Sequence, residues 1–342
     1  MFGVVTVIFF LFNILPGDPA QMMLGQNENS EQLKIVKKKY GFDKPLTKQY
    51  LLYLNDLSPI SIHSKNEQDY SFFGEKYTGI QLLNFSRLTL NFKYPYLRTS
   101  FVNQGKKVSE IIGETLPNTF ILAFSAIIIA VIFGLVLGII SALNKGNYID
   151  ILIQLLSTIG MSVPSFFSAI IFAWIFGFVL KDLTGLEMTG SLYELDDYGE
   201  TYNLRLKNLI LPSIVLGIRP LAVITQLVRN ELLDVLTQDY IRTAKAKGLS
   251  KFYTIKDHAL KNALNPVVTV ISGWFASLLA GAVFVEFIFG WNGIGKEIVN
   301  ALNLLDMPVI MGSVLVIAFM FILINILVDI IYVKLDPRIK ID

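Results

Sequence analysis

The chain has 342 residues, of which 53% are hydrophobic and only 16% are charged. Soluble domains carry about 25% charged residues, so this composition excludes an ordinary soluble protein and predicts an integral membrane protein. The absence of cysteine excludes a disulfide framework, a thiol nucleophile and a thiolate metal site. The two histidines, His63 and His258, lie far apart and indicate no metal cluster.

Six apolar segments run along the chain. A spanning helix needs roughly 20 apolar residues, and five segments reach that length, at about 120–143, 151–180, 209–228, 267–289 and 309–332. The sixth, at 2–15, has about 14 residues. We interpret it as a first span and not as a cleaved signal peptide, because no Lys or Arg precedes it and no small-residue cleavage site follows.

The positions of Lys and Arg predict the orientation. Residues 229–261 contain seven of them, and the turn at 144–150 and the C-terminal tail add more. With six spans these segments share one side, which the positive-inside rule makes cytoplasmic. The acidic loop at 181–208 and the long segment at 17–116 then face outside, and both termini are cytoplasmic.

The outer segment is long enough for a small folded domain. Ser30 followed by Glu31 predicts a helix start, and a second amphipathic helix is predicted at 50–57. Residues 59–74 are polar and predict a loop, and Pro117 is predicted to begin the second span. Two compatible interpretations are a cap on the outer helix ends, and a docking surface for a soluble partner or a guard over a pore mouth.

Two interruptions in the spans are candidates for a translocation path. Ser162 and Pro164 lie in the third span, where Pro is expected to kink the helix for gating or for packing. Arg219 lies inside the fourth span, where a charge is costly and therefore a functional candidate. It would contact a substrate carboxylate, extend to the interface, or pair with a neighbouring helix.

A polar, basic segment at 239–266 separates the fourth and fifth spans. Residues 240–247 favour a helix, Gly248 suits a C-terminal cap with positive φ, and a second helix is predicted at about 251–264. Such a hairpin can rest on anionic lipid headgroups, but small residues such as Ala244 beside a fixed turn favour docking of a protein.

The loop at 290–297 is a near miss to the phosphate-binding pattern G-x-x-x-x-G-K-[ST]. Its last position is Glu297, which has no hydroxyl for Mg²⁺. The loop is also predicted to lie outside, where ATP is absent. Any ATP dependence must therefore come from another chain.

The polar segment resembles the coupling loop of ABC importer permeases, in particular the B-type permease subunit of the oligopeptide and dipeptide group. The resemblance rests on DYIRTAKAKGLS at 239–250 and HALKNALNP at 258–266. Further matches follow in order along nearly the whole chain: LPGDP at 15–19, YGFDKP at 40–45, LPNT at 116–119, SVPSF at 162–166, FGWNGIG at 289–295 and LDPR at 335–338.

This resemblance implies an all-α integral membrane protein with six transmembrane helices in the type I ABC importer permease fold. The implied parts are a first span at 1–16, an extracytoplasmic segment at 17–116, and a transmembrane domain at 117–342 with a coupling loop at 231–262. The implied location is the bacterial plasma (inner) membrane. The implied partners are a second homologous permease, one or two cytoplasmic ATPases, an extracytoplasmic substrate-binding protein and membrane lipid, without nucleic acid. ATP and Mg would be bound by the partner subunits and no cofactor by this chain.

The resemblance also assigns candidate residues. The ATPase-coupling residues are Asp239, Tyr240, Arg242, Thr243, Ala244, Lys245, Gly248 and Leu249. The outer-loop candidates are Trp291, Gly293 and Gly295. The translocation-path candidates, Arg219, Pro164 and Ser162, come from the interruptions in the spans and not from the resemblance. Arg242 stands where the general family pattern has Glu, and Thr243 where it has Ala. Two further departures matter more. The start lacks basic residues, which suggests a shortened or misassigned N-terminus, and Arg219 suggests distinct substrate chemistry.

The predicted function is that of a non-catalytic permease subunit for di- and oligopeptides. Alternatives within the family are nickel or metal-chelate, haem and glutathione importers. An ATP-independent channel or transporter would predict paired intramembrane charges or inverted repeats, and the sequence shows neither clearly. A membrane enzyme or sensor lacks any catalytic set.

Overall fold

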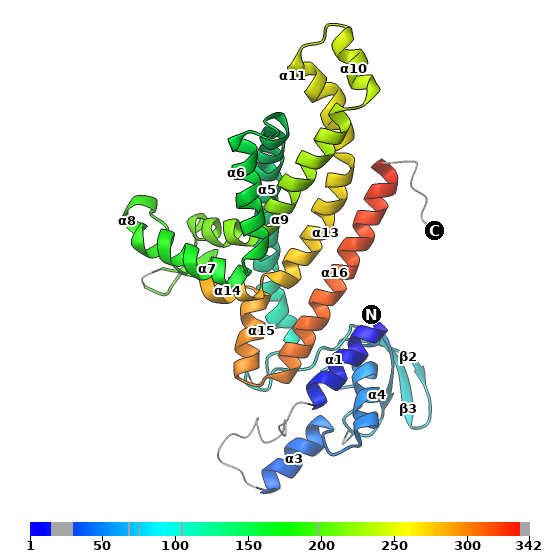
Figure 1. Cartoon of the computed structure of the whole chain (residues 1–342). Helices are drawn as coiled ribbons and strands as arrows, with labels where there is room; N and C mark the ends of the chain where they lie inside the picture. Colours follow the sequence, from blue (N-terminus) through cyan, green and yellow to red (C-terminus); the bar gives the residue numbers. More distant parts are fainter. Residues whose placement is uncertain (15–29, 68, 75, 104, 197, 336–342) are drawn as a thin grey trace. The chain divides into compact units, whose positions relative to one another are not determined.

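Figure 1 shows the computed structural model, which describes residues 1–14, 30–67, 69–74, 76–103, 105–196 and 198–335. The motif at 15–19 and all but the first residue of the motif at 335–338 lie outside these residues. The chain forms two compact units. We call residues 1–114 with 297–319 the first unit, and residues 115–296 with those from 320 onward the second unit.

The structure is mostly helical and contains long apolar helices. Within the described residues, three helices are long and apolar enough to span a membrane, or up to five if each of two bent helix pairs is one span. Helix α1 (Phe2–Ile14) has 13 residues and measures about 20 Å, less than the roughly 30 Å of a bilayer core. A membrane protein with three to five candidate spans is thus supported, and the sixth span stays a prediction.

The helices from residue 108 onward follow the predicted apolar and polar segments. In chain order they are α5 (Val108–Leu143), α6 (Tyr148–Ser162), α7 (Ser165–Trp174), the π-helix η1 (Ile175–Val179), α8 (Lys181–Thr184), the 3₁₀-helix η2 (Leu206–Leu209), α9 (Ile210–Leu236), α10 (Asp239–Ala246), α11 (Lys251–Tyr253), the π-helix η3 (Thr254–Ala259), α12 (Leu260–Ala263), α13 (Asn265–Gly281), α14 (Val283–Phe289), α15 (Ile294–Asn303) and α16 (Met307–Leu335).

Two glycines bring α5 and α9 together in the second unit. A Cβ atom at Gly138 would lie 2.7 Å from Cβ of Val228 and 2.8 Å from the Thr225 carbonyl oxygen. At Gly134, one turn earlier, a Cβ atom would lie 2.8 Å from Cγ2 of Ile224. No real side chain fits at such distances, so the two backbones approach as small-xxx-small helix pairs do in membranes.

The third predicted span is broken and not merely kinked. The axes of the α6 and α7 segments differ in direction by 109°. Val163 and Pro164, between them, are extended, with ψ of 129° and 139°. Proline has no N–H to donate and disfavours the α conformation of the preceding residue, so the helix ends at Ser162 and restarts at Ser165.

The first unit combines helices with a small sheet. Besides α1 it contains α3 (Ser30–Tyr40), which begins at the predicted Ser30, and α4 (Leu46–Leu57). The strands β1 (Ile60–Ser64), β2 (Gly79–Asn84) and β3 (Leu88–Lys93) form an antiparallel sheet in the order β1-β3-β2.

The prediction of an all-helical chain is wrong in the outer segment and in the loop at 181–208. Residues 60–64 were predicted as a loop because they are polar, but Ser61 and His63 alternate with isoleucines and are buried, which is the period-2 pattern of a strand. The second unit contains a further two-stranded sheet, β4 (Tyr193–Leu195) with β5 (Tyr202–Leu204).

The helix that contains the second predicted span begins ahead of Pro117. Helix α5 begins at Val108, and Pro117 lies inside it. Val108, Ile111 and Ile112 are all buried. The packing of this first apolar turn extends the helix ahead of the proline and outweighs the preference of proline for a helix start.

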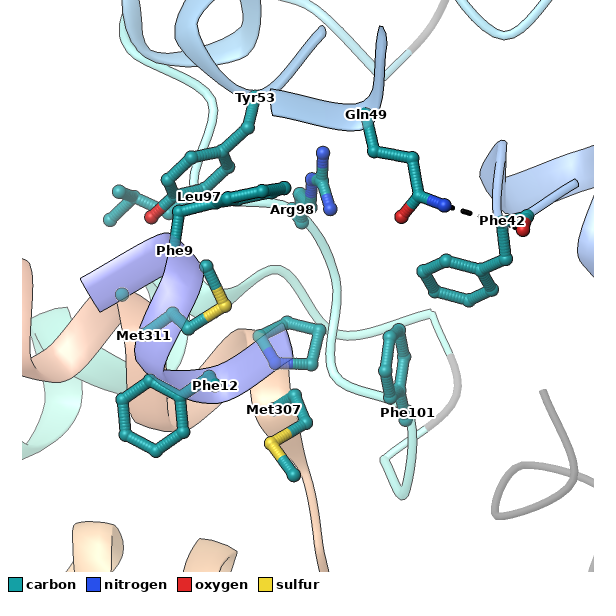
Figure 2. A pocket seen from close by; sticks show the side chains of 12 residues that line it. Phe9, Phe12, Phe42, Gln49, Tyr53, Leu97, Arg98, Phe101, Met307 and Met311 are labelled. Atoms are coloured by element: carbon teal, nitrogen blue, oxygen red, sulfur yellow. Dashed lines mark hydrogen bonds between the residues drawn. The ribbon is translucent and has the colours of Figure 1, made fainter. Parts of the chain in front are cut away.

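An aromatic cluster joins the helices of the first unit. A cavity of about 40 Å³ is bordered by Phe9 of α1, Tyr53 of α4 and Met311 of α16. Figure 2 shows these side chains with Arg98 and Gln49 among them. Gln49 donates to the main-chain oxygens of Phe42 and Lys44. A cavity of this size holds at most a few water molecules, so it is a gap in packing and not a ligand site.

A buried carboxylate organises the rest of the first unit. Asp56 on α4 is 1% exposed. Five groups donate to its carboxylate or to its main-chain oxygen: the Tyr70 hydroxyl at 2.7 Å, the Tyr77 hydroxyl at 2.8 Å, Arg98 Nε at 3.1 Å, the Tyr96 amide at 2.9 Å and Lys93 Nζ. Asp56 therefore fastens α4 to five residues of the chain between positions 70 and 98.

We predict that acid weakens this unit through His63. The fully buried ring donates from Nδ1 to the Ser71 carbonyl at 3.0 Å, and its Nε2 lies 2.8 Å from the Ser61 hydroxyl, which can donate to the neutral ring. Burial lowers the pKa of His63 to about 4. As pH falls from about 6.5 towards 4, His63 becomes protonated in the unfolded chain but stays neutral in the folded unit. Protonation therefore stabilises the unfolded chain, and the free energy of unfolding decreases by at most about 3 kcal/mol.

Hydrogen exchange of the β1 and β3 amides between pH 7 and 4.5, corrected for intrinsic rates, measures this effect. Protection should decrease across the range in the wild type, and the pH dependence should vanish in His63→Gln. Equal slopes in the two proteins would contradict the assignment.

Candidate functional site

The polar segment at 239–266 folds into the predicted helical hairpin. Helix α10 ends in a Schellman cap, in which the Leu249 amide donates to the Ala244 oxygen and the Gly248 amide donates to the Lys245 oxygen. Gly248 has φ of +82°, as predicted. Segments α11, η3 and α12 return the chain to α13, and Figure 1 shows α10 and α11 beyond the end of α9. We call residues 239–263 the hairpin.

The inner face of the hairpin is closely packed. Ile241 and Ala244 of α10 are buried in a cluster with Ala259, Ala263 and Leu232. Ala244 was expected to take part in coupling, and in this chain it is buried. Its small side chain lets α10 lie close to the returning segment.

The other candidate coupling residues lie on the surface. They are Asp239, Tyr240, Arg242, Thr243, Lys245, Gly248 and Leu249. Arg242 forms an ion pair with Asp239 at 3.3 Å, but both side chains are solvated, and such pairs contribute little to stability.

The turn of the hairpin presents an apolar surface that sequence reasoning missed. Leu249, Phe252 and Tyr253, which we call the hairpin tip, are 40%, 66% and 56% exposed. Their neighbours are basic, and Lys256 Nζ lies 5.9 Å from the centre of the Phe252 ring. Exposed aromatic residues within a polar surface are typical of protein contacts. The sequence contained one signal for this surface, the aromatic pair Phe252 and Tyr253 shortly after the turn at Gly248.

A second candidate site is a cavity of about 390 Å³ beside the break in the third span. It is lined by residues of α6, α7, α9 and α13 and of the break itself: Gly160, Val163, Ser165, Ser168, Val215, Leu216, Ile218, Arg219, Pro220, Trp274, Ser277, Leu278 and Gly281. Of the predicted path residues, Arg219 lines the cavity. Ser162 and Pro164 adjoin the lining without belonging to it.

Arg219 is exposed in this chain. No carboxylate of the described residues lies within ion-pair distance of its guanidinium. It lies midway along the segment predicted to span the membrane at 209–228. An arginine at the centre of a span costs about 2.5–3.5 kcal/mol on insertion scales, which makes a functional role the default explanation.

The candidate outer loop at 290–297 is closely packed against its neighbours. Trp291 is fully buried, and its Nε1 donates to the Asn118 carbonyl at 3.0 Å. A Cβ atom at Gly295 would lie 2.5 Å from the Val283 Cα. A Cβ atom at Gly293 would meet the buried carboxylate of Glu286. That carboxylate also accepts the Gly295 amide at 2.7 Å, so tight packing explains these residues.

An ion pair below the hairpin was not foreseen. Arg229 Nε and Nη2 each donate to the carboxylate of Asp150 at 2.7 Å. The Ser141 hydroxyl and the Gly146 amide complete its coordination. This bidentate pair holds the α5–α6 turn against α9. No spacing in the sequence predicts a contact between residues so far apart.

Comparison with known proteins gives a family match over most of the chain. Residues 134–341 match the model of binding-protein-dependent transport system inner membrane components, and residues 1–81 match the N-terminal model of such membrane components. The dipeptide transport system permease protein of Alkalihalophilus pseudofirmus is 35% identical, over 99% of this chain and 95% of its own length. The glutathione transport system permease protein of Salmonella paratyphi A is 32% identical, over 98% and 94%.

A similar fold occurs among solved structures. A chain of a methionine ABC transporter in an inward-facing conformation aligns with a TM-score of 0.54 at 15% identity, covering 67% of this chain and 97% of that chain. At this identity the similarity concerns the fold alone.

Proposed function

Because the chain belongs to the family of binding-protein-dependent transport system inner membrane components, we propose that it is the import permease of an ATP-driven transporter for dipeptides and longer peptides. The observation that carries this proposal is the polar hairpin with its exposed apolar tip, a surface suited to a second protein. The relative that transports dipeptides supports the substrate class. The relative that transports glutathione, itself peptide-like, makes a glutathione importer the second candidate.

The proposed arrangement places six spans in the type I ABC importer fold. The first span lies at 1–16, the extracytoplasmic segment at 17–116 and the transmembrane domain at 117–342, with both termini and the coupling loop at 231–262 in the cytoplasm. A second permease completes the path, a binding protein delivers the substrate outside, and one or two ATPases bind ATP and Mg inside.

In the proposed mechanism the hairpin docks on an ATPase through its tip. The hairpin is continuous with α9 on one side and with α13 on the other. Movement of the docked ATPase would therefore act directly on two helices that line the cavity containing Arg219. The buried Ala244 holds α10 against the rest of the hairpin. The Asp150–Arg229 pair holds the first turn of α6 against α9. The hairpin and the adjoining ends of these helices would therefore move as one body.

Replacement of Gly248 tests the coupling role. Gly248→Val forces a β-branched residue into the left-handed region, which costs roughly 1–2 kcal/mol, although no atom of the structure opposes the added side chain. We expect recovery of co-expressed ATPases with the purified permease to fall roughly 5- to 30-fold. Gly248→Asn should retain more binding, because asparagine tolerates this conformation.

The matched control is Gly199→Val. Gly199 has φ of +73° and equally open surroundings, but it lies in the β4–β5 turn. This variant should bind the ATPases normally. Normal ATPase binding and normal peptide uptake by Gly248→Val would argue against the proposed coupling role.

A further inference from the structure

We infer that the cavity beside the broken third span binds the carboxylate of the transported substrate, with Arg219 as the recognition group. The inference rests on the proposed import function and specifies which end of the substrate the permease recognises. It follows from the lining of the cavity, from the partners of the neighbouring acids and from the way α7 begins.

The cavity lining is mostly apolar and carries one charged side chain, Arg219. Among its residues only Arg219 is charged, and Ser165, Ser168 and Ser277 supply hydroxyls. Trp274 and aliphatic side chains make up most of the remaining surface. A ligand that fits this chemistry has one anionic group and an apolar body. The cavity volume of about 390 Å³ lies within the range of small-molecule sites, roughly 300–1,000 Å³.

Two buried acids near the ends of these helices have partners elsewhere. Asp150 is bonded to Arg229, and Glu286 accepts the amides of Gly295 and Lys296. Among the described residues no carboxylate neutralises Arg219. Its guanidinium remains available for a bidentate contact, the geometry in which arginine binds a carboxylate most strongly.

The break in the third span adds a second source of positive potential. Helix α7, with 10 residues, begins at Ser165 in the cavity wall. The amides of Ser165 and Phe166 have no acceptor within the described chain. The N-terminus of a helix attracts anions, and half-helices that begin inside a transporter often point at the anionic group of the substrate near the midplane of the bilayer.

The lining contains no carboxylate that could bind an ammonium group. The site therefore distinguishes peptides by the C-terminal carboxylate and not by the amino end. A dipeptide and its N-acetyl derivative should bind alike, whereas the C-terminal amide should bind weakly.

The cysteine-free sequence allows a direct test. In the assembled transporter, Ser277→Cys places one thiol of this chain in the cavity wall, and its labelling by a small methanethiosulfonate reagent can be followed on this subunit. Alanyl-phenylalanine and N-acetyl-alanyl-phenylalanine should slow labelling roughly tenfold, whereas the C-terminal amide should slow it less than about twofold. Adding Arg219→Gln should abolish the protection, and Arg219→Lys should restore part of it.

The charge of the reagent gives a second measurement. A sulfonate-bearing reagent should label faster than a trimethylammonium-bearing one, and Arg219→Gln should reverse or remove that preference. Arg219→Gln removes a charge from the span, so it should insert at least as well as the wild type. Equal protection by acid and amide, or protection that survives Arg219→Gln, would overturn the inference. So would absence of protection with unchanged reagent preference, the result expected if the second permease pairs with Arg219.

Peptide uptake into proteoliposomes with the binding protein separates this inference from the proposed function. Uptake without carboxylate-dependent protection would overturn the site and leave the import function standing. Protection without uptake of any peptide would overturn peptide import and leave the carboxylate site standing.

Discussion

Replacing Phe252 and Tyr253 together by serine is expected to lower ATP-driven uptake by at least roughly 30-fold, as for the loss of a binding hot spot. The two side chains are 66% and 56% exposed, so the isolated chain loses little packing when they are removed. Under the proposed mechanism they fill a groove on the ATPase, where burial of aromatic rings supplies much of the binding free energy.

Uptake in proteoliposomes, together with co-elution of permease and ATPase, measures this effect. The basal activity of the ATPases alone provides the internal reference. The matched control is the double variant Tyr198→Ser and Tyr202→Ser, which removes two tyrosines that are 88% and 71% exposed on the β4–β5 sheet and its turn. The control should retain ATPase binding. Full coupling after loss of the tip aromatics would show that the basic side chains, and not the tip, make the contact.

The positions of the tip and the cavity suggest how one affects the other. Helix α9 carries Arg219 and leads into the hairpin, and α13 carries Trp274 and follows the hairpin in the chain. A displacement at the tip would therefore change the spacing of the two cavity walls without passing through the first unit. Close packing at Gly134 and Gly138 holds α5 against α9, so α5 would follow the same movement.

The apolar segments, the hairpin and its glycine cap were predictable because each depends on local sequence. A run of apolar residues predicts a span wherever it occurs, and the cap needs only a glycine at the end of a short helix. The break at Pro164 was foreseen as a kink only, because its size depends on extended backbone at both Val163 and Pro164.

The remaining features depend on contacts between residues far apart in sequence. Ala244 is an ordinary small residue until the cluster that buries it is known. Strand β1 alternates in its sequence, but contacts with distant residues decide that its polar side, and not its isoleucine side, is buried. The Asp150–Arg229 pair joins residues 79 positions apart, and no pattern marks Asp56 as the centre of five hydrogen bonds.

Asp56→Ala is expected to destabilise the first unit by about 3–5 kcal/mol, the usual cost of removing one partner of a buried ion pair. The variant leaves the Arg98 guanidinium and the hydroxyls of Tyr70 and Tyr77 without their acceptor. Arginine cannot shed its charge at neutral pH, so the uncompensated cation must be hydrated, which opens the packing around it. Arg98 also has φ of +67°, a strained backbone that the contact with Asp56 helps to hold.

Hydrogen exchange of the β1–β3 amides in the full-length protein measures the loss. Asp56→Asn should recover part of the stability, because the amide oxygen still accepts one hydrogen bond while the charge stays unpaired. The matched control is Asp69→Ala, which removes an exposed carboxylate bonded only to the Ser64 hydroxyl in the described chain and should cost less than about 1 kcal/mol. Similar losses for Asp56→Ala and Asp69→Ala would mean that packing of Tyr53, Phe9 and the sheet stabilises this unit without a central carboxylate.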